Sequence, residues 1–496
     1  MKNSTIFCIL LSFLCLVLES CGAGNGASEM VLEHFTVNEQ TIPISPDYAF
    51  VTVPRNIAPL NFRYTAANAK KAETIFIYNG KRLKIKGLEV KWNPRKWKKM
   101  LSESVGCDIM VKGIVRFKGA SVQEYSWKIS VSPDPVDSYL SYRLIEPGYE
   151  VWDDVCIVER CTEDFSETVL SSYKNTSNAC MNCHVHSQGR GDLSIFYLRG
   201  PKGGAILNRN GSLRKLSLKD STMISGTVYG EIHPGGRFGV FSSNIIVPGF
   251  HTFGNRRLEV FDSASDLCIA DFDENRMIVP EHLARKDVFE TFPAFSADGK
   301  RIFYCSADTV SLPGDIQNLR YSLCSVSFDS QTGECGKDVQ VLREGVSVCH
   351  PKASPDGKFL VYTVADYGTF PIWHTECDLE MMDLDTGRTI SMEAANSDRS
   401  DTYHSWSSNS RWLLFASKRG DGQYGKPYFC HIGEDGSVSK PFVLPQKDPS
   451  FYEHTLKSFN IPDLSSTSVG FDYKTIGRIW KDVEAEPFNI AHYLAK

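Results

Sequence analysis

Apolar and polar residues alternate along most of the chain, which is the pattern of β-strands that bury one face. Between residues 31 and 145, stretches such as "DYAFVTVP", "ETIFIYNG" and "YSWKISVS" alternate in this way and are separated by Pro, Gly and Asn. One stretch, "NPRKWKKMLSES" (93–104), has helical spacing instead. We therefore expect a β-sandwich-like domain over residues 31–145, with a single helix.

From residue 192 the chain repeats itself. The segments "IHPGGRFGVFSSN", "FSADGKRIFYCSAD", "ASPDGKFLVYTVAD" and "WSSNSRWLLFASKR" each join a turn to an apolar strand. Their turn residues are His233, Ser296, Ser354 and Ser407, and a degenerate fifth unit covers 193–216. Four short strands per unit is the spacing of a β-propeller blade, so residues 192–445 are expected to form a propeller of five to seven blades.

Two connecting regions differ from the repeats. Residues 146–191 contain "EDFSETVLSSY" (163–173), which we interpret as a short helix, followed by a Cys-rich loop. Residues 446–496 are expected to wrap the outside of the propeller, with a closing helix at "DYKTIGRIWKDVE" (472–484).

The N-terminus has the pattern of a secretory signal. A Lys precedes "IFCILLSFLCLVL", an apolar run too short for an ordinary membrane span, and the run ends at Leu18-Glu19-Ser20-Cys21. This resembles a bacterial lipoprotein cleavage site. Residues 1–21 are then the signal, an acylated Cys21 holds the chain to a lipid bilayer, and residues 22–30 are a flexible tether. Gly22 and Ala23 favour the outer membrane, facing the periplasm. The alternative is ordinary cleavage that releases a soluble periplasmic protein.

Charge and cysteine content narrow the function classes. A net charge of −5 and a pI near 6.2 give no basic field for nucleic acid. Of the 15 cysteines, ten lie outside the signal, the lipidation site and the motif described next, and in an exported protein these can pair. Cys324 and Cys335 flank a hairpin-like turn and could face each other, although a buried free thiol is equally compatible with the pattern.

The stretch "NACMNCHVHSQG" holds a Cys-x-x-Cys-His motif. Two thiols separated by two residues can form thioethers to the haem vinyl groups, and the following imidazole then binds the iron. The motif predicts one covalent haem c on Cys180 and Cys183, with His184 as proximal ligand. A redox dithiol and a structural disulfide or metal pair are the alternatives.

A six-coordinate haem also needs a distal ligand. Helical cover near the motif is sparse, so the haem would borrow surface from the propeller or the N-terminal domain. The candidates in the first part of the propeller are Met223, His233, His251, Met277 and His282. Each of these alone is also compatible with an ordinary core Met or turn His.

A second group of histidines lies in the late repeats. His350, His374 and His404 occur in "CHPKASPDG", "FPIWHTECD" and "DTYHSW", and His350 and His404 both precede a turn Ser by a few residues. Loops and strands of a propeller can line its central channel, so these histidines are pocket candidates for metal binding or acid–base chemistry. Packing between blades is the competing interpretation.

These residues carry a resemblance. The Ser-x-Asp-Gly-Lys turns resemble the TolB-type propeller repeat. Together with the lipoprotein signal and "ACMNCH", they resemble a family of Bacteroidetes lipoproteins that combine one c-type haem motif with a TolB-like propeller. The stretches "DYGTFPIWHTECDL" and "YHSWSSNSRWLLFASKRGDG" contribute to the likeness. The resemblance implies the fold and extends over most of residues 30–460, and it implies no particular reaction.

Three functions remain, and the sequence favours the first. The first is a c-type cytochrome-like lipoprotein that transfers electrons through its haem to a redox partner protein or envelope complex, with the propeller as docking platform. The second is a TolB-like scaffold or binding lipoprotein with a structural Cys pair. The third is a haem-linked propeller oxidoreductase. No nucleophile elbow, phosphate loop or dinucleotide fingerprint occurs, which favours a non-enzymatic protein.

Overall fold

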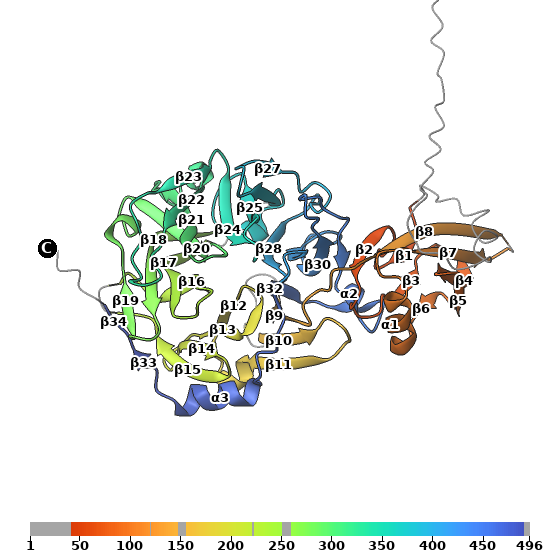
Figure 1. The fold of residues 1–496 in the computed structure, drawn as a ribbon, viewed down its shortest axis with the longest axis horizontal. Helices are drawn as coiled ribbons and strands as arrows, with labels where there is room; N and C mark the ends of the chain where they lie inside the picture. Colours follow the sequence, from red (N-terminus) through yellow and green to blue (C-terminus); the bar gives the residue numbers. More distant parts are fainter. Residues whose placement is uncertain (1–40, 120, 147–154, 221–222, 250–258, 491–496) are drawn as a thin grey trace, which may run out of the picture.

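The chain was analysed as a computed structural model that describes residues 41–119, 121–146, 155–220, 223–249 and 259–490. Figure 1 shows a ring of sheets with a smaller β-rich part beside it. Strands dominate, which confirms the expectation of a mainly β protein. The signal, Cys21 and the tether lie outside the described residues.

The smaller part contains two sheets and one helix. One sheet has the order β2-β8-β7-β4-β5 and the other the order β1-β3-β6. Alternate residues of the long strands are buried between them, as the sequence pattern predicts. The strands are β1 (Ile44–Ser45), β2 (Val51–Pro54), β3 (Phe62–Tyr64), β4 (Ala69–Tyr78), β5 (Lys81–Lys86), β6 (Glu89–Val90), β7 (Asp108–Phe117) and β8 (Val122–Ser132).

The helix of this part is α1 (Pro94–Ser102), within the range predicted from the sequence. The Asn93 side chain accepts hydrogen bonds from the backbone N–H groups of Arg95 and Lys96 at 3.1 and 3.2 Å, which caps the helix start. Trp97 is 1% exposed and donates its indole N–H to the Ile57 carbonyl at 2.8 Å, so the helix is held against the sheets.

The ring consists of six antiparallel sheets in the described part of the chain. Their inner strands are β12 (Met181–Ser187), β16 (Thr227–Ile232), β20 (Val288–Phe295), β24 (Ser347–Ala353), β28 (Asp401–Trp406) and β32 (Ser458–Ser465). Each inner strand contacts the next in this order, and β32 contacts β12, so the ring is closed.

In the sheets of β12 and β16 a fifth strand, β33 (Glu486–Pro487) or β34 (Asn489–Ile490), pairs in parallel with the outermost strand. Every sheet has three further outer strands. They are β13 (Arg190–Leu198), β14 (Gly204–Arg209) and β15 (Ser212–Ser217); β17 (Phe238–Gly249), β18 (Glu259–Asp271) and β19 (Arg276–Ile278); β21 (Arg301–Asp308), β22 (Ser322–Ser327) and β23 (Gln340–Arg343); β25 (Phe359–Ala365), β26 (Asp378–Asp383) and β27 (Thr389–Ile390); β29 (Trp412–Ser417), β30 (Lys426–His431) and β31 (Phe442–Val443); and β9 (Tyr139–Ile145), β10 (Cys156–Cys161) and β11 (Glu167–Ser172).

The repeated turns of the sequence join the inner strands β16, β20, β24 and β28 to the next strand of their sheets. In the turn after β20, the Ser296 hydroxyl donates to the Asp298 carboxylate at 2.7 Å, and Asp298 accepts from the Lys300 N–H at 3.0 Å. Gly299 has a φ of 70°, a conformation that favours glycine. The turn after β24 repeats this arrangement, so the sequence repeat records a local hydrogen-bonding requirement.

The ring is closed by strands from opposite ends of the chain. β32 pairs with β9, so a segment after residue 446 supplies the inner strand of a sheet whose other strands precede the first repeat. The expectation that residues 446–496 only wrap the outside is therefore wrong for β32. It is right in kind for α3 (Tyr473–Asp482), which packs against β11 and the short 3₁₀ segment Tyr173–Thr176.

The predicted helix at 163–173 is also wrong. Residues 167–172 form the strand β11, paired with β10. Hydrogen bonding to a neighbouring strand overrides a weak local helical pattern.

Of the two alternatives for Cys324 and Cys335, the structure has free thiols and no disulfide between them. They belong with nine other free cysteines of the described chain, most of them buried. A free Cys in a sheet core behaves as a small apolar side chain.

One hydrophobic core joins the smaller part to the ring. It includes Phe62 and Trp127 from the smaller part together with Trp412 and Leu464 from the ring. The Trp412 indole donates to the Asp134 carbonyl at 3.2 Å. The smaller part therefore buries apolar surface against the sheet of β32, which closes the ring.

We expect Leu464→Ala to lower the free energy of unfolding by about 2–5 kcal/mol, because Leu464 is fully buried on the closing strand. Urea unfolding followed by tryptophan fluorescence measures this. The matched control is Leu456→Ala at a side chain that is 65% exposed, with an expected change within about 0.5 kcal/mol. Equal effects of the two substitutions would contradict the role of β32 in closing the ring.

Candidate functional site

The same irregularity interrupts every inner strand of the ring. In each one, two residues face a single residue of the next strand, which is a β-bulge. The bulges fall on 182–183, 228–229, 292–293, 350–351, 403–404 and 461–462. Six bulges at one level of a ring bring backbone from six sheets to the axis.

Four bulge residues have backbone conformations that are rare for their types. Phe292, His350, Tyr403 and Ile461 have φ between 48° and 53°. Such conformations cost on the order of 1–3 kcal/mol each and persist where the surrounding structure imposes them. Their clustering around one axis marks this level of the ring as a candidate site.

Aromatic rings line the axis at this level. The centroid distances are 4.5 Å for Tyr229–Phe292, 4.1 Å for Phe292–His350 and 5.2 Å for His350–Tyr403, so the rings form a continuous arc. The arc borders a cavity of about 90 Å³, which Val228 and Lys352 also line. We call this the axial cavity.

A layer of charged groups lies two residues further along the inner strands. The Lys352 ammonium is 3.4 Å from the Glu231 carboxylate. The other Glu231 oxygen accepts from the Phe295 N–H at 2.8 Å, and Asp463 accepts from the His186 N–H at 2.7 Å. Burial raises the pKa of both carboxyls, and Lys352 opposes that shift.

The predicted pocket candidates His350 and His404 both belong to this region. Burial lowers the pKa of each imidazole to about 3, so both are neutral at pH 7. The His404 Nε2 lies 2.8 Å from the Val361 carbonyl on the neighbouring sheet, while its Nδ1 is buried without a hydrogen-bond partner. His404 therefore ties two sheets together beside the axial cavity.

The third pocket candidate, His374, lies elsewhere. Its Nδ1 is 3.1 Å from the Glu376 carboxylate and its Nε2 is 3.8 Å from Glu259. Tyr367 packs against its ring at 4.9 Å. His374 is 1% exposed and does not line the axial cavity, so the structure does not join it to His350 and His404.

The Cys-x-x-Cys-His motif enters the ring at the start of β12. Cys180 precedes the strand and is half-buried, and its carbonyl accepts from the Arg199 N–H at 2.9 Å. Asn182 and Cys183 form the bulge of β12. The motif is thus part of a paired strand, where the sequence had indicated a loop.

His184 occupies the place in β12 that His404 occupies in β28. Both residues stand three positions before the residue at which their turn begins, Ser187 and Ser407. Burial lowers the pKa of both imidazoles. The Ser141 backbone, on the neighbouring sheet, opposes this shift of the His184 pKa as the Val361 backbone opposes that of His404, although neither His184 nitrogen makes a hydrogen bond to it. His184 is 2% exposed and stacks on Phe196 at 5.9 Å and 19°.

The surroundings of His184 meet one requirement of a covalent haem. Both imidazole nitrogens are buried without a partner among the described residues, which an iron ligand would satisfy. Phe196 stacks on one face of the imidazole, which does not block a ligand that binds a ring nitrogen in the ring plane. The axial cavity beside His184, at about 90 Å³, is too small to enclose a haem, so a haem attached here would lie outside it.

The four predicted distal ligands within the described residues contact groups other than His184. Met277 is in the core of its sheet, and Met223 packs against that core. His233 lies beside Gly299, and His282 lies 2.7 Å from the Gly336 carbonyl. His251 is outside the described residues. Four of the five candidates thus have structural roles.

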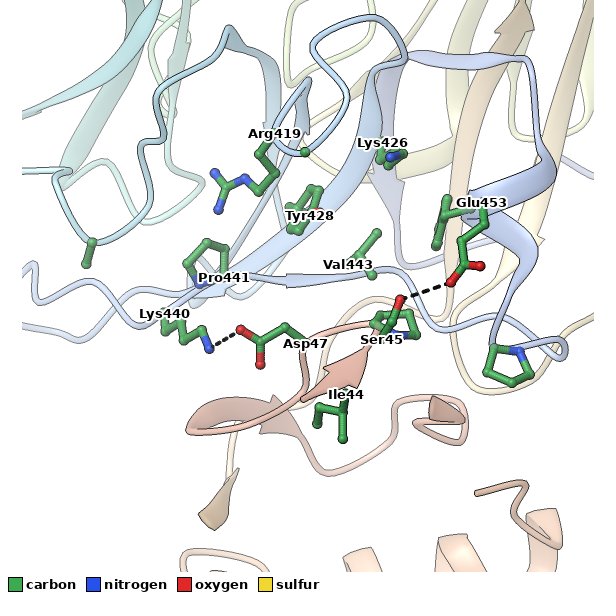
Figure 2. Close-up of a pocket in the computed structure, with 15 residues that line it drawn as sticks. Ile44, Ser45, Asp47, Arg419, Lys426, Tyr428, Lys440, Pro441, Val443 and Glu453 are labelled. Atoms are coloured by element: carbon green, nitrogen blue, oxygen red, sulfur yellow. Dashed lines mark hydrogen bonds and ion pairs between the residues drawn. The ribbon is translucent and has the colours of Figure 1, made fainter. Parts of the chain in front are cut away.

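A larger cavity of about 520 Å³ separates the smaller part from the ring. Figure 2 shows Lys440 paired with Asp47, at 2.6 Å, and Ser45 bonded to Glu453. Arg419 packs over Tyr428 at 4.5 Å and pairs with Asp401 at 3.0 Å. The charged groups of these walls have partners within the protein, so the cavity has the character of a contact between two parts.

Metal-binding clusters and membrane-spanning helices are both absent from the described residues. No three His, Cys, Asp or Glu side chains within the described ranges are close enough to hold a metal ion. No helix in these ranges is long and apolar enough to span a membrane.

Sequence reasoning missed the aromatic arc and the charged layer. Tyr229, Phe292, His350 and Tyr403 each stand four residues before their turn residue, and Glu231 and Lys352 stand two before. Aligning the repeats on their turns would have exposed both positions. The same alignment places Cys183 four residues before Ser187, at the arc position.

Comparisons with known proteins assign no family. No family model and no curated protein matches the chain. Solved structures that resemble it include a puromycin-hydrolyzing peptidase of Mycobacterium tuberculosis, with 13% identity, 61% of this chain and 39% of that chain covered, and a TM-score of 0.29. A DUF4784 family protein from Bacteroides caccae has 9% identity, 73% and 98% coverage, and a TM-score of 0.31.

A hypothetical selenium-binding protein from Sulfolobus tokodaii has 10% identity, 82% and 96% coverage, and a TM-score of 0.40. The chain spans well under half the length of the peptidase. With TM-scores below 0.5, these likenesses support no assignment of function.

We expect His404→Gln to make the protein less sensitive to acid. Because the pKa of His404 is about 3 in the folded chain and ordinarily 6.5, the unfolded chain takes up the proton first. Its contribution is complete above pH 6.5 and is lost as the pH falls toward 3. Between pH 7 and pH 5 the wild type should lose about 2 kcal/mol that the variant keeps, measured by urea unfolding. The exposed His454→Gln control should behave as wild type.

Proposed function

We propose that the chain is an envelope-anchored binding lipoprotein whose ring of six sheets is a TolB-type β-propeller and whose axial cavity holds a small molecule. In this proposal Cys21 is acylated and fixes the chain to the outer membrane on its periplasmic side. The N-terminal sheets form a β-sandwich-like domain that braces the closing sheet. Cys180 and Cys183 are structural thiols at the entry to the first inner strand.

The observation that carries the proposal is the row of rare backbone conformations at the axis. Phe292, His350, Tyr403 and Ile461 hold positive φ at equivalent bulges, and all four line one cavity. Such residues concentrate at binding and catalytic sites because the cost of strain is retained where it serves function. The cavity combines aromatic walls with few polar groups, which is the usual make-up of a small-molecule site, and its volume of about 90 Å³ limits the ligand to a few heavy atoms.

Binding is favoured over catalysis by the state of the titratable groups. His350 and His404 have pKa values of about 3, so neither exchanges a proton near neutral pH as a general acid or base would. The carboxylates of Glu231 and Asp463 accept hydrogen bonds from backbone N–H groups. The remaining polar groups are suited to holding a ligand in place.

We expect Val228→Phe to abolish ligand binding, because the larger side chain fills a cavity of about 90 Å³. The measurement is the thermal midpoint with a panel of small carboxylates, amines and neutral compounds at millimolar concentration. At least one class should raise the midpoint of the wild type by about 2 °C or more. The control, Val341→Phe at an outer-strand residue that is 58% exposed, should keep the shift. Absence of any shift, or an equal shift in the filled variant, would remove the axial cavity as the site.

Electron transfer through one covalent haem c is the second candidate. It is supported by the spacing of Cys180, Cys183 and His184, and by the two unpartnered nitrogens of the His184 imidazole. If haem is attached, the two thiols hold it, and it would supply one-electron redox chemistry.

The two candidates separate in a single preparation. We expect protein made alongside a c-type maturation system to show no covalent haem on a stained denaturing gel and no pyridine haemochrome spectrum. Cys180→Ser should then leave the thermal midpoint and ligand shifts unchanged within error. One haem per chain would instead make the protein a cytochrome and overturn the structural assignment of the thiols.

A further inference from the structure

Lys352 is the charged side chain that faces the axial cavity. It comes from β24, two residues after the arc residue His350, and its side chain is 26% exposed although it lies amid the inner strands. The one hydrogen bond of its ammonium within the described chain is the long contact of 3.4 Å to Glu231. An ammonium group has three N–H donors, so Lys352 has donors to offer a ligand.

The walls above Lys352 are mostly apolar. Phe292, Ile461 and Pro293 join the two tyrosines and Val228 around the cavity. A ligand that fits has a small hydrocarbon body against the rings and an acceptor group at the ammonium. Charged oxygens form the strongest hydrogen bonds to an ammonium, which favours a carboxylate head.

We infer that the axial cavity binds a small carboxylate with an apolar body, its head held by Lys352 and its body by the aromatic arc. This inference rests on the proposed binding function and names the ligand class for it.

The charges around Lys352 allow an anion to enter. Glu231 and Asp463 face it from β16 and β32, and burial raises the pKa of each, so a proton can be taken up as the anion binds. His350 and His404 are neutral and neither repel nor pair with the ligand. Glu231 therefore competes with the ligand for the Lys352 ammonium, which gives opposite expectations for two substitutions.

Isothermal titration of the full-length protein with isobutyrate, isobutyramide and isobutylammonium tests the ligand class without any variant. The carboxylate should bind about 10- to 100-fold more tightly than its neutral amide, as expected for a charge-assisted hydrogen bond. The ammonium should bind no better than the amide.

Variants then test the residue. Lys352→Met should weaken isobutyrate by about 10- to 100-fold, whereas Lys358→Met, at an exposed lysine six residues away, should not. Glu231→Gln should tighten isobutyrate binding, since the amide can still accept from the Phe295 N–H but no longer neutralises Lys352. The thermal midpoint of each variant shows that it is folded.

The results of these experiments separate the carboxylate inference from the proposed binding function on which it rests. If the amide or the ammonium binds as tightly as the carboxylate, and Val228→Phe blocks it, the carboxylate inference is wrong and the axial binding site stands. A cation site would also show as weaker binding in Glu231→Gln. If none of the three probes binds and the broader panel gives no shift, both the inference and the binding function are overturned.

Discussion

The bulge in each inner strand is the constraint on which the rest of the ring depends. In a regular strand, successive side chains point to opposite faces, so this alternation alone would decide which side chains reach the axis. At the bulge, two residues face one residue of the next strand. One side chain then points to the axis, and the following one points to the adjacent sheet. Tyr403 and His404 show the division, because Tyr403 joins the aromatic arc and His404 reaches the Val361 carbonyl. One backbone irregularity thereby serves both the cavity and the cohesion between sheets.

Closure has a different physical origin. Short turns connect each of the first five inner strands to the next strand of its sheet. In contrast, β32 pairs with β9, which is more than 300 residues away in the chain. The entropy cost of such a pairing is offset by the apolar core that the closing sheet shares with the smaller part, including Trp412 and Leu464. The Trp412 indole bond to Asp134 adds a polar anchor at the same place. The smaller part is consequently tied to the integrity of the ring.

The sequence predicted what local chemistry determines. The Ser-x-Asp-Gly turns, the helix capped by Asn93 and the closing helix α3 all follow from hydrogen bonds or periodicity within a few residues. It failed for β32, which was read as an outer tail because its partner β9 lies far away in the chain. It also failed for β11, where pairing with the preceding strand β10 overrides a weak local helical pattern. The histidine pocket was found in part, since His350 and His404 converge and His374 does not. Lys352 was missed because a lysine in a strand has no motif to mark it.

The Cys-x-x-Cys-His motif shows how one string of residues can satisfy two physical demands. Haem attachment needs only thiol spacing and an adjacent imidazole. An inner strand of this ring needs a residue for the axis four positions before the turn and a side chain that reaches the next sheet three positions before it. His184 stands three residues before Ser187 as His404 stands three before Ser407, and Cys183 stands four before Ser187 as Tyr403 stands four before Ser407. The place of His184 between sheets is therefore accounted for by the repeat itself, and a haem is not needed to explain why a histidine stands there. What a haem would explain is the two unpartnered nitrogens, and that leaves covalent attachment as the decisive measurement on this segment.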